Sequence, residues 1–132
     1  MLINLIPLQI HGDERGALVA LEEAKNIPFA IKRVYYMFNT GTSVRRGLHA
    51  HRRLKQVAIV LRGSCRFVLD DGRERIEVLL DNPQQGLLIE SIIWREMYDF
   101  SSDCVLMVLA DNLYDESDYI RNYDEFLLEV KK

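Results

Sequence analysis

The chain has few cysteines, no long apolar run and no strong excess of charge, and each of these absences narrows what it can be. No apolar segment approaches the roughly 20 residues that a membrane-spanning helix needs. The N-terminus, Met-Leu-Ile-Asn-Leu-Ile-Pro, lacks the charged start of a signal peptide. The 17 basic and 20 acidic residues give a net charge of −3, which predicts no general attraction to nucleic acid or to acidic membranes. We therefore expect a cytoplasmic protein with neither a nucleic-acid nor a membrane partner.

Only two cysteines, Cys65 and Cys104, occur in the 132 residues, and each lies in an apolar, strand-like run. In a cytosolic protein this placement predicts two buried free thiols rather than a disulfide. Hydrophobic residues make up 48% of the chain, which is enough to fill the core of one domain of ordinary size.

Short strand-like runs separated by turn residues dominate the sequence. The sequence Asp70-Asp71-Gly72 predicts a tight hairpin turn, because Gly tolerates positive φ, and Arg62-Gly63-Ser64 predicts another turn. Strands at such short spacing indicate an all-β sandwich or barrel. The runs are 2–10, 17–21, 29–38, 54–61, 65–69, 73–80, 86–89, 94–100 and 105–110.

The C-terminus has the only helical pattern. Ser117 is a suitable N-cap and Asp118 a suitable first-turn acid. An apolar stripe at helical spacing follows, which is usually a packing face; it consists of Ile120, Tyr123, Phe126, Leu127 and Val130. We predict one domain over residues 1–132, with a barrel at about 1–112 and a helix at about 117–130.

Two histidines, His49 and His51, are one residue apart in a strand-like segment. Alternate residues of a strand point to the same face, so both imidazoles are expected to enter one space. Imidazole transfers protons near neutral pH and is also the commonest metal ligand. Because Arg45 and Arg46 lie a few residues before the pair, an anionic ligand could be held beside a centre of proton transfer.

The pattern Gly47-x-His49-x-His51-x4-Gln56-x6-Gly63 resembles the first signature motif of the cupin superfamily. That resemblance implies a cupin-type antiparallel β-barrel (jelly roll) with its site inside. In metal-binding cupins a Glu stands at the Gln56 position and a His at the Arg95 position. A guanidinium carries a permanent charge and cannot ligate a cation, so we predict no metal and no cofactor.

Longer segments resemble the dTDP-4-keto-6-deoxyglucose 3,4-ketoisomerases of nucleotide-sugar biosynthesis. The resemblance implies a metal-free cupin enzyme, a homodimer, whose substrate is a dTDP-linked keto-deoxysugar. The segment 2–6 is a plausible strand for exchange between subunits, because open sheet edges are normally covered. The segments include Arg15-Gly-x-Leu-Val-Ala-Leu-Glu22-Glu23, Arg46-Gly-x-His-Ala-His51, Trp94-x-Glu-Met97 and Tyr114-Asp-Glu-x-Asp-Tyr-Ile-Arg121.

Moving a ketone from carbon 4 to carbon 3 needs a base for the carbon 3 proton and a donor for the enediolate oxygen. A neutral His suits the first task near pH 7. We favour His51 as the base and His49 as its partner, although the sequence does not fix this division. Tyr35 or Tyr36 could donate a hydrogen bond to the oxyanion.

Four arginines are candidates for binding the substrate. Arg46 is the first choice for the diphosphate, through bidentate charge-assisted hydrogen bonds, and Arg33 and Arg15 are second choices. Arg95 stands where the resembled family has either His or Arg, and it could position a water or a hydroxyl group near carbon 4. The sequence leaves the configuration of carbon 4 in the product open.

Two other functions are compatible with the same pattern. A nucleotide-sugar epimerase would use the same proton abstraction at a different carbon. A non-catalytic sugar-binding cupin would bind the sugar without reacting with it. The His pair argues against a purely structural module but does not separate isomerase from epimerase.

Overall fold

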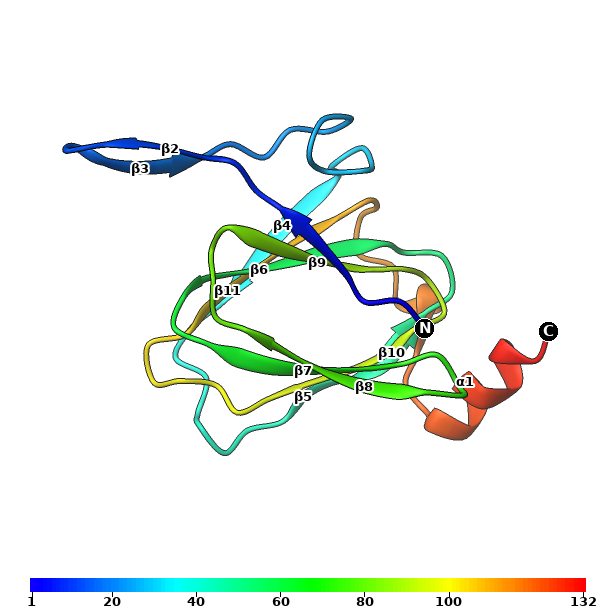
Figure 1. The fold of residues 1–132 in the computed structure, drawn as a ribbon. Helices are drawn as coiled ribbons and strands as arrows, with labels where there is room; N and C mark the ends of the chain where they lie inside the picture. Colours follow the sequence, from blue (N-terminus) through cyan, green and yellow to red (C-terminus); the bar gives the residue numbers. More distant parts are fainter.

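Two five-stranded antiparallel sheets face each other in the computed structural model, which describes residues 1–132 (Figure 1). The first sheet has the order β1 (Asn4–Pro7), β9 (Gln85–Ile89), β6 (Gln56–Arg62), β11 (Val105–Ala110) and β4 (Arg33–Met37). The second has the order β12 (Tyr119–Ile120), β5 (Arg46–His51), β10 (Trp94–Tyr98), β7 (Cys65–Asp70) and β8 (Arg75–Leu80). The all-β, cupin-type architecture is thereby confirmed, with two facing sheets that have no strand in common rather than one continuous closed ladder.

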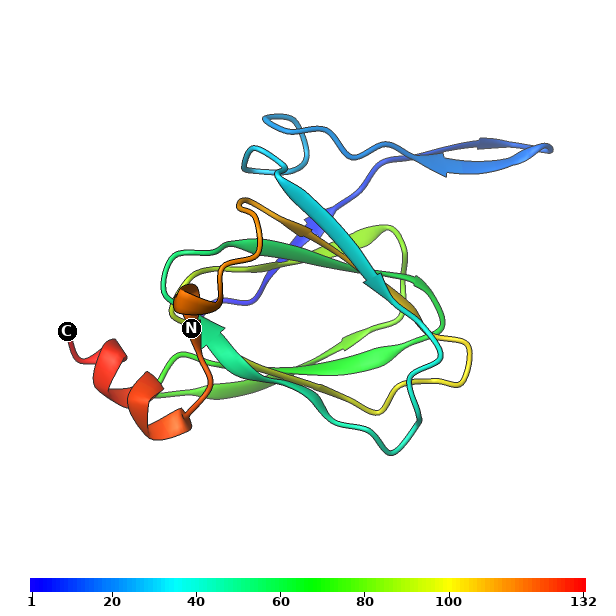
Figure 2. The same ribbon diagram turned by 180° about the vertical axis from the view of Figure 1, so that it is seen from behind.

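The main core lies between the two sheets. The view from behind also shows the two sheets facing each other (Figure 2). Every second residue of a strand enters the core, as Leu106 and Val108 of β11 do, because successive side chains of a strand point to opposite faces. Cys65 and Cys104 belong to this core as buried free thiols, which confirms the prediction for the cysteines. A second apolar cluster, on the outer face of the first sheet, is covered by the segment that leads to β4.

The predicted turn at Asp70-Asp71-Gly72 joins β7 and β8 in a hairpin, with Gly72 at φ +94°. The side chain of Asp71 accepts hydrogen bonds from the backbone N–H groups of Arg73 and Glu74. The predicted turn at Gly63 has a different role, because β6 and β7 belong to different sheets. It carries the chain from one layer to the other rather than closing a hairpin.

The segment 2–10, which reads as one apolar run, is divided in the structure. Asn4–Pro7 pairs with β9 of the same chain, and a separate hairpin of β2 (Ile10–Asp13) and β3 (Gly16–Val19) projects away from the sheets (Figure 1). No helix of the structure has the length and apolar character needed to cross a bilayer.

The C-terminal helix begins later than predicted. Ser117 lies in the short 3-10 helix η1 (Glu116–Asp118), and α1 (Tyr123–Val130) is capped by Asn122, whose side chain accepts from the N–H of Glu125. The prediction of one helix from Ser117 was wrong because Tyr119 and Ile120 pair with β5 instead. Burial of Ile120 against the second sheet overrides the local helical pattern.

Candidate active site

His49 and His51 lie on the inner face of β5, and their ring centroids are 4.9 Å apart with the planes nearly perpendicular. The backbone before them is unusual, because Gly47 has φ +82° and Leu48 has φ +60°. A Cβ atom at Gly47 would lie 3.0 Å from the carbonyl oxygen of Arg95, so only glycine fits this approach to β10. The predicted sharing of one face by the two imidazoles is confirmed.

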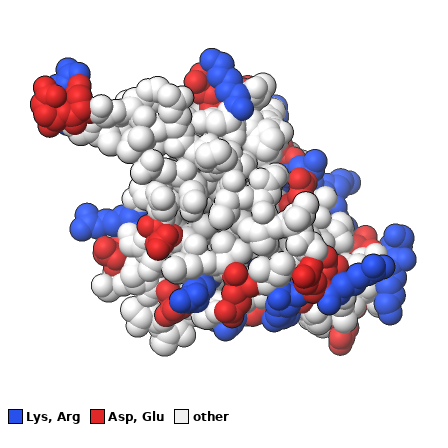
Figure 3. Space-filling view, viewed as in Figure 1, with Lys and Arg blue, Asp and Glu red and all other residues white.

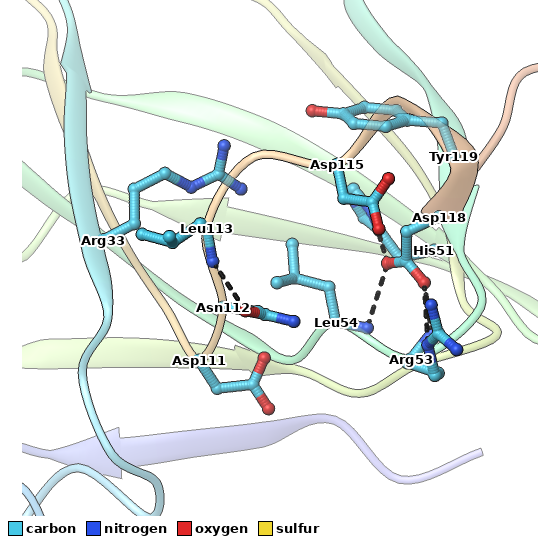
Figure 4. Close-up of a pocket in the computed structure, with 10 residues that line it drawn as sticks. All are labelled: Arg33, His51, Arg53, Leu54, Asp111, Asn112, Leu113, Asp115, Asp118 and Tyr119. Atoms are coloured by element: carbon cyan, nitrogen blue, oxygen red, sulfur yellow. Dashed lines mark hydrogen bonds and ion pairs between the residues drawn. The ribbon is translucent and has the colours of Figure 1, made fainter.

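The carboxylate of Asp118 contacts the imidazole of His51, and Figure 4 shows the two residues next to each other. The Nδ1 atom of His51 is 3.2 Å from Oδ2 of Asp118, and a carboxylate only accepts, so Nδ1 carries the proton. The backbone N–H groups of Arg53 and Leu54 donate to the same carboxylate at 2.9 and 3.1 Å. This tautomer leaves the lone pair on Nε2 of His51, a buried atom without a hydrogen-bond partner.

Tyr119 packs against both imidazoles, with centroid distances of 4.9 Å to His49 and 4.4 Å to His51. Tyr119 and Asp118 were not predicted as site residues, because both fall in the segment that was predicted to be helical. The signal that could have found them is the segment Tyr114-Asp-Glu-x-Asp-Tyr-Ile-Arg121, which contains both.

A buried arginine organises the other side of the pair. Arg95 is 2% exposed, and its Nη1 donates to Oε1 of Gln56 at 2.5 Å. The Nε2 of Gln56 in turn donates to the hydroxyl oxygen of Tyr35 at 3.0 Å. Because that oxygen is already accepting, the hydroxyl proton of Tyr35 is left free to be donated elsewhere. Arg95 therefore acts on the site through its charge and through the orientation of Tyr35.

Burial and Arg95 keep both histidines neutral. Burial, followed by the nearby Arg95 charge, lowers the pKa of His49 to about 4 and that of His51 to about 2. Burial also raises the pKa of Tyr35, although Arg95 and the bond from Gln56 oppose this. At neutral pH the site thus combines two unprotonated imidazoles with a protonated phenol, which is suited to base catalysis with oxyanion stabilisation.

An open cleft of about 370 Å³ lies between β4 and β5. His49 lines this cleft and also a small inner pocket that it shares with Tyr35, Gln56 and Arg95. His51 instead lines a separate cavity of about 130 Å³, the one drawn in Figure 4. The polar and charged residues of the cleft are Arg33, Tyr35, Arg46, His49, Tyr119 and Arg121.

Arg33 stands between the cleft and the cavity of Figure 4, because it lines both. Its Nε atom is buried without a partner, and its guanidinium lies 5.4 Å from the ring centroid of Tyr35. Arg46 and Arg121 also line the cleft. Arg121 is paired with Glu116 through bonds of 2.8 and 2.9 Å, so Arg33 and Arg46 are the arginines of the cleft with charge to offer a ligand.

The structure separates two predicted residues from this site. Tyr36 lies on the opposite face of β4 from Tyr35, is exposed, and stacks on Phe38, so Tyr35 is the tyrosine of the site. Arg15 lies in the turn between β2 and β3, where it pairs with Asp13 and its side chain is 84% exposed. The projecting hairpin carries it away from the cleft of its own chain (Figure 1).

The residues around the His pair do not fit a divalent cation. No group of three or more His, Cys, Asp or Glu side chains could hold a metal ion. The guanidinium of Arg95 lies beside the pair, because Arg95 is paired with His49 across β10 and β5 and lines the same inner pocket, and its charge repels a cation.

Comparisons with known proteins agree with this chemistry. A curated TDP-4-oxo-6-deoxy-alpha-D-glucose-3,4-oxoisomerase from Aneurinibacillus thermoaerophilus is 58% identical over 120 residues, which are 91% of this chain and 86% of the relative. A mutant of the 3,4-ketoisomerase QdtA from Thermoanaerobacterium thermosaccharolyticum, solved with TDP-4-keto-6-deoxyglucose, is 44% identical. Its TM-score is 0.96, with 99% of this chain and 96% of that chain covered.

An epimerase from Mycobacterium tuberculosis shares the fold alone, with a TM-score of 0.74 at 18% identity over 87% of this chain and 66% of that chain. The fold and the site thus define a cupin-like enzyme of the isomerase class. Residues 1–131 match the family FdtA, described as WxcM-like, C-terminal, and the chain belongs to that family.

Proposed function

We propose that this protein converts TDP-4-keto-6-deoxyglucose to a TDP-3-keto-6-deoxyhexose through the pair of neutral histidines on β5. The reaction class, a sugar 3,4-ketoisomerisation, follows from the relative at 58% identity. The observation that carries the mechanism is the position of His49, which lines an arginine-bearing cleft together with the hydroxyl-bearing Tyr35. No cofactor takes part in a shift of two protons within one sugar.

The base takes the proton from carbon 3, which is acidic because it is next to the carbon 4 ketone. The electron pair of that C–H bond forms a double bond between carbons 3 and 4, and the π pair of the ketone passes to the carbon 4 oxygen, which gives an enediolate. The proton of the carbon 3 hydroxyl is then transferred to the carbon 4 oxygen while a proton returns to carbon 4, which leaves the ketone at carbon 3. Atoms and electrons balance without an oxidant or a reductant.

We assign the base to His49 and the supporting role to His51, the reverse of the division favoured from the sequence. His49 lines the open cleft and the inner pocket. His51 lines neither of them, is 1% exposed, and is hydrogen-bonded to Asp118. A base must come within hydrogen-bond reach of the proton that it removes, and the cleft gives His49 that reach.

Tyr35 is proposed to donate to the enediolate oxygen. Gln56 fixes its hydroxyl oxygen, and Arg95 places a positive charge beside the inner pocket. Donors oriented in advance stabilise developing charge without reorganising during the reaction. Arg95 does not easily release a proton, so its part is to fix this arrangement and to position a water or a hydroxyl group at carbon 4.

For the diphosphate we propose Arg46 and Arg33. Both line the cleft, and the Nε of Arg33 is buried without a partner, so it lacks the acceptor that a phosphate oxygen would supply. Both arginines line the same cleft as His49, which suits a sugar held at the base while the arginines bind its diphosphate.

We also propose a homodimer in the cytoplasm. The projecting hairpin and the outer face of the first sheet enclose an apolar hollow of about 290 Å³, and the face of the molecule drawn in Figure 3 carries few charges between the hairpin tip and the second sheet. Light scattering should give twice the chain mass of 15.4 kDa, and a monomer mass at micromolar concentration would refute the dimer.

Proton NMR in deuterated water tests the proposed reaction. Incubation with TDP-4-keto-6-deoxyglucose should produce a 3-keto sugar with deuterium at carbon 4. The same reaction in ordinary water gives the configuration at carbon 4, through the coupling between the protons on carbons 4 and 5. Deuterium at carbon 3 or carbon 5 with the ketone retained at carbon 4 would instead indicate an epimerase. Binding of TDP without any change in the sugar would indicate a non-catalytic cupin.

A further inference from the structure

The two residues that hold the histidines from the C-terminal side, Asp118 and Tyr119, lie on a weakly paired segment. β12 consists of only two residues, Tyr119 and Ile120, which pair with His51 and Ala50 of β5. So short a strand at the edge of a sheet has few backbone hydrogen bonds to hold it. The N–H groups of Arg53 and Leu54 hold the Asp118 carboxylate directly, and contacts outside β12 must keep the segment that follows it in place.

Helix α1 supplies an apolar anchor on the other face of the second sheet. Phe126 is 0% exposed and lies 5.9 Å from the ring centroid of Trp94, and Tyr123 lies 5.3 Å from the same ring. Together with Ala50 and Ile120 these aromatics form a cluster of their own. Because Trp94 directly precedes Arg95 in β10, the cluster backs the strand that carries the buried cation of the site.

One hydrogen bond fixes the same helix to β7, and further polar contacts link that point of β7 to β8 and β10. The hydroxyl of Tyr123 donates to Oδ2 of Asp70 at 2.7 Å, and Nε of Arg75 donates to that atom at 3.0 Å. Arg75 also reaches Glu96, to which the indole N–H of Trp94 donates at 2.9 Å. The helix is thus held to β7 through Tyr123 and to β10 through the packing of Phe126 on Trp94, and Arg75 of β8 connects the two strands.

We propose that α1 acts as a clamp for catalysis, with Phe126, Trp94 and Tyr123 as positioning residues that keep Asp118 on Nδ1 of His51. None of the three lines the cleft or the cavities beside the histidines. They act on the tautomer of His51 through the place of Asp118. The effect on turnover rests on the proposed function, whereas the effect on the tautomer does not.

The test compares Phe126→Ala with Leu128→Ala, a matched truncation on the 63% exposed side of the same helix. Nitrogen-15 NMR of the imidazoles should report a single Nδ1–H tautomer for His51 in wild type and in Leu128→Ala. In folded Phe126→Ala a mixture of tautomers is expected. Its kcat should fall about tenfold to hundredfold, the range set by one hydrogen bond to a charged group, with KM within about twofold of wild type.

Tyr123→Phe is the second variant, because it keeps the aromatic packing and removes only the bond to Asp70. It should shift the tautomer and kcat in the same direction by a smaller amount, and it carries the test if Phe126→Ala does not fold. Folded Phe126→Ala or Tyr123→Phe with one Nδ1–H tautomer and wild-type kcat would overturn the clamp. A changed tautomer in an enzyme without ketoisomerase activity would support the clamp while refuting the proposed function.

Discussion

The pH dependence of turnover distinguishes a buried His49 base from an ordinary histidine. Burial and the charge of Arg95 both disfavour the imidazolium, and they lower the pKa of His49 from 6.5 to about 4. At pH 5.5 a base with a pKa of 6.5 would be only about 9% unprotonated, whereas one with a pKa of 4 would be about 97% unprotonated. We therefore expect kcat/KM to change very little between pH 7.5 and pH 5.5, and to fall with a midpoint near 4.

The measurement is kcat/KM for the keto sugar across this range, because that ratio reports the pKa of the free enzyme. Fluorescence of the single tryptophan, Trp94, provides the control for folding at each pH. A roughly tenfold fall in kcat/KM between pH 7.5 and pH 5.5, with the fluorescence unchanged, would match an unperturbed histidine. That result would refute either His49 as the base or the arrangement that buries it beside Arg95.

Further variants test the other parts of the site. Asp118→Asn should lower kcat by on the order of 10²-fold or more without weakening the binding of TDP. The reason is that an amide can donate to Nδ1 of His51 and so select the wrong tautomer. A normal kcat would contradict this. The pKa of His51 is about 2 in the folded chain and 6.5 in the unfolded chain. The unfolded chain therefore binds the extra proton, and the free energy of unfolding decreases as the pH falls below 6.5. Between pH 6 and pH 5, His51→Asn should remove about 1.2 kcal/mol of that loss, measured by urea unfolding. An unchanged slope would show that His51 is not buried in its neutral form. Arg46→Ala should weaken the binding of TDP, measured by calorimetry, with a smaller loss of kcat at saturating substrate; unchanged binding would leave Arg33 as the diphosphate ligand. Dialysis against a chelator should leave activity intact, because Arg95 stands beside the His pair, and activity restored only by added metal would contradict it.

Local patterns in the sequence were enough to predict most of the strands and the orientation of the His pair. The period of two places His49 and His51 on one face whatever the rest of the chain does, since it follows from the geometry of an extended backbone. The turn at Gly72 was equally local, because its positive φ depends on the residue itself. The motifs at 15–23, 46–51, 94–97 and 114–121 predicted the family, and the family match over residues 1–131 confirms that prediction.

The same local reasoning failed where packing competes with propensity. Residues 117–122 have a helical pattern, but Ile120 is buried against Ala50, so that Tyr119 and Ile120 pair as a strand and the helix begins only at Tyr123. For Tyr35 and Tyr36, parity separated the two faces of the strand but did not say which one is buried. Only the neighbouring strand β11 and the facing sheet decide that Tyr35 points inward.

The sequence by itself determined which side chains share a strand face and which catalytic groups the chain has, because those follow from backbone periodicity and from residue chemistry. Tertiary structure alone decided how those groups are tuned. The bond between His51 and Asp118 spans 67 positions and the bond between Arg95 and Gln56 spans 39, and no local pattern encodes such contacts. The lowered pKa values of His49 and His51 have the same origin, since burial and the charge of Arg95 exist only once the two sheets face each other.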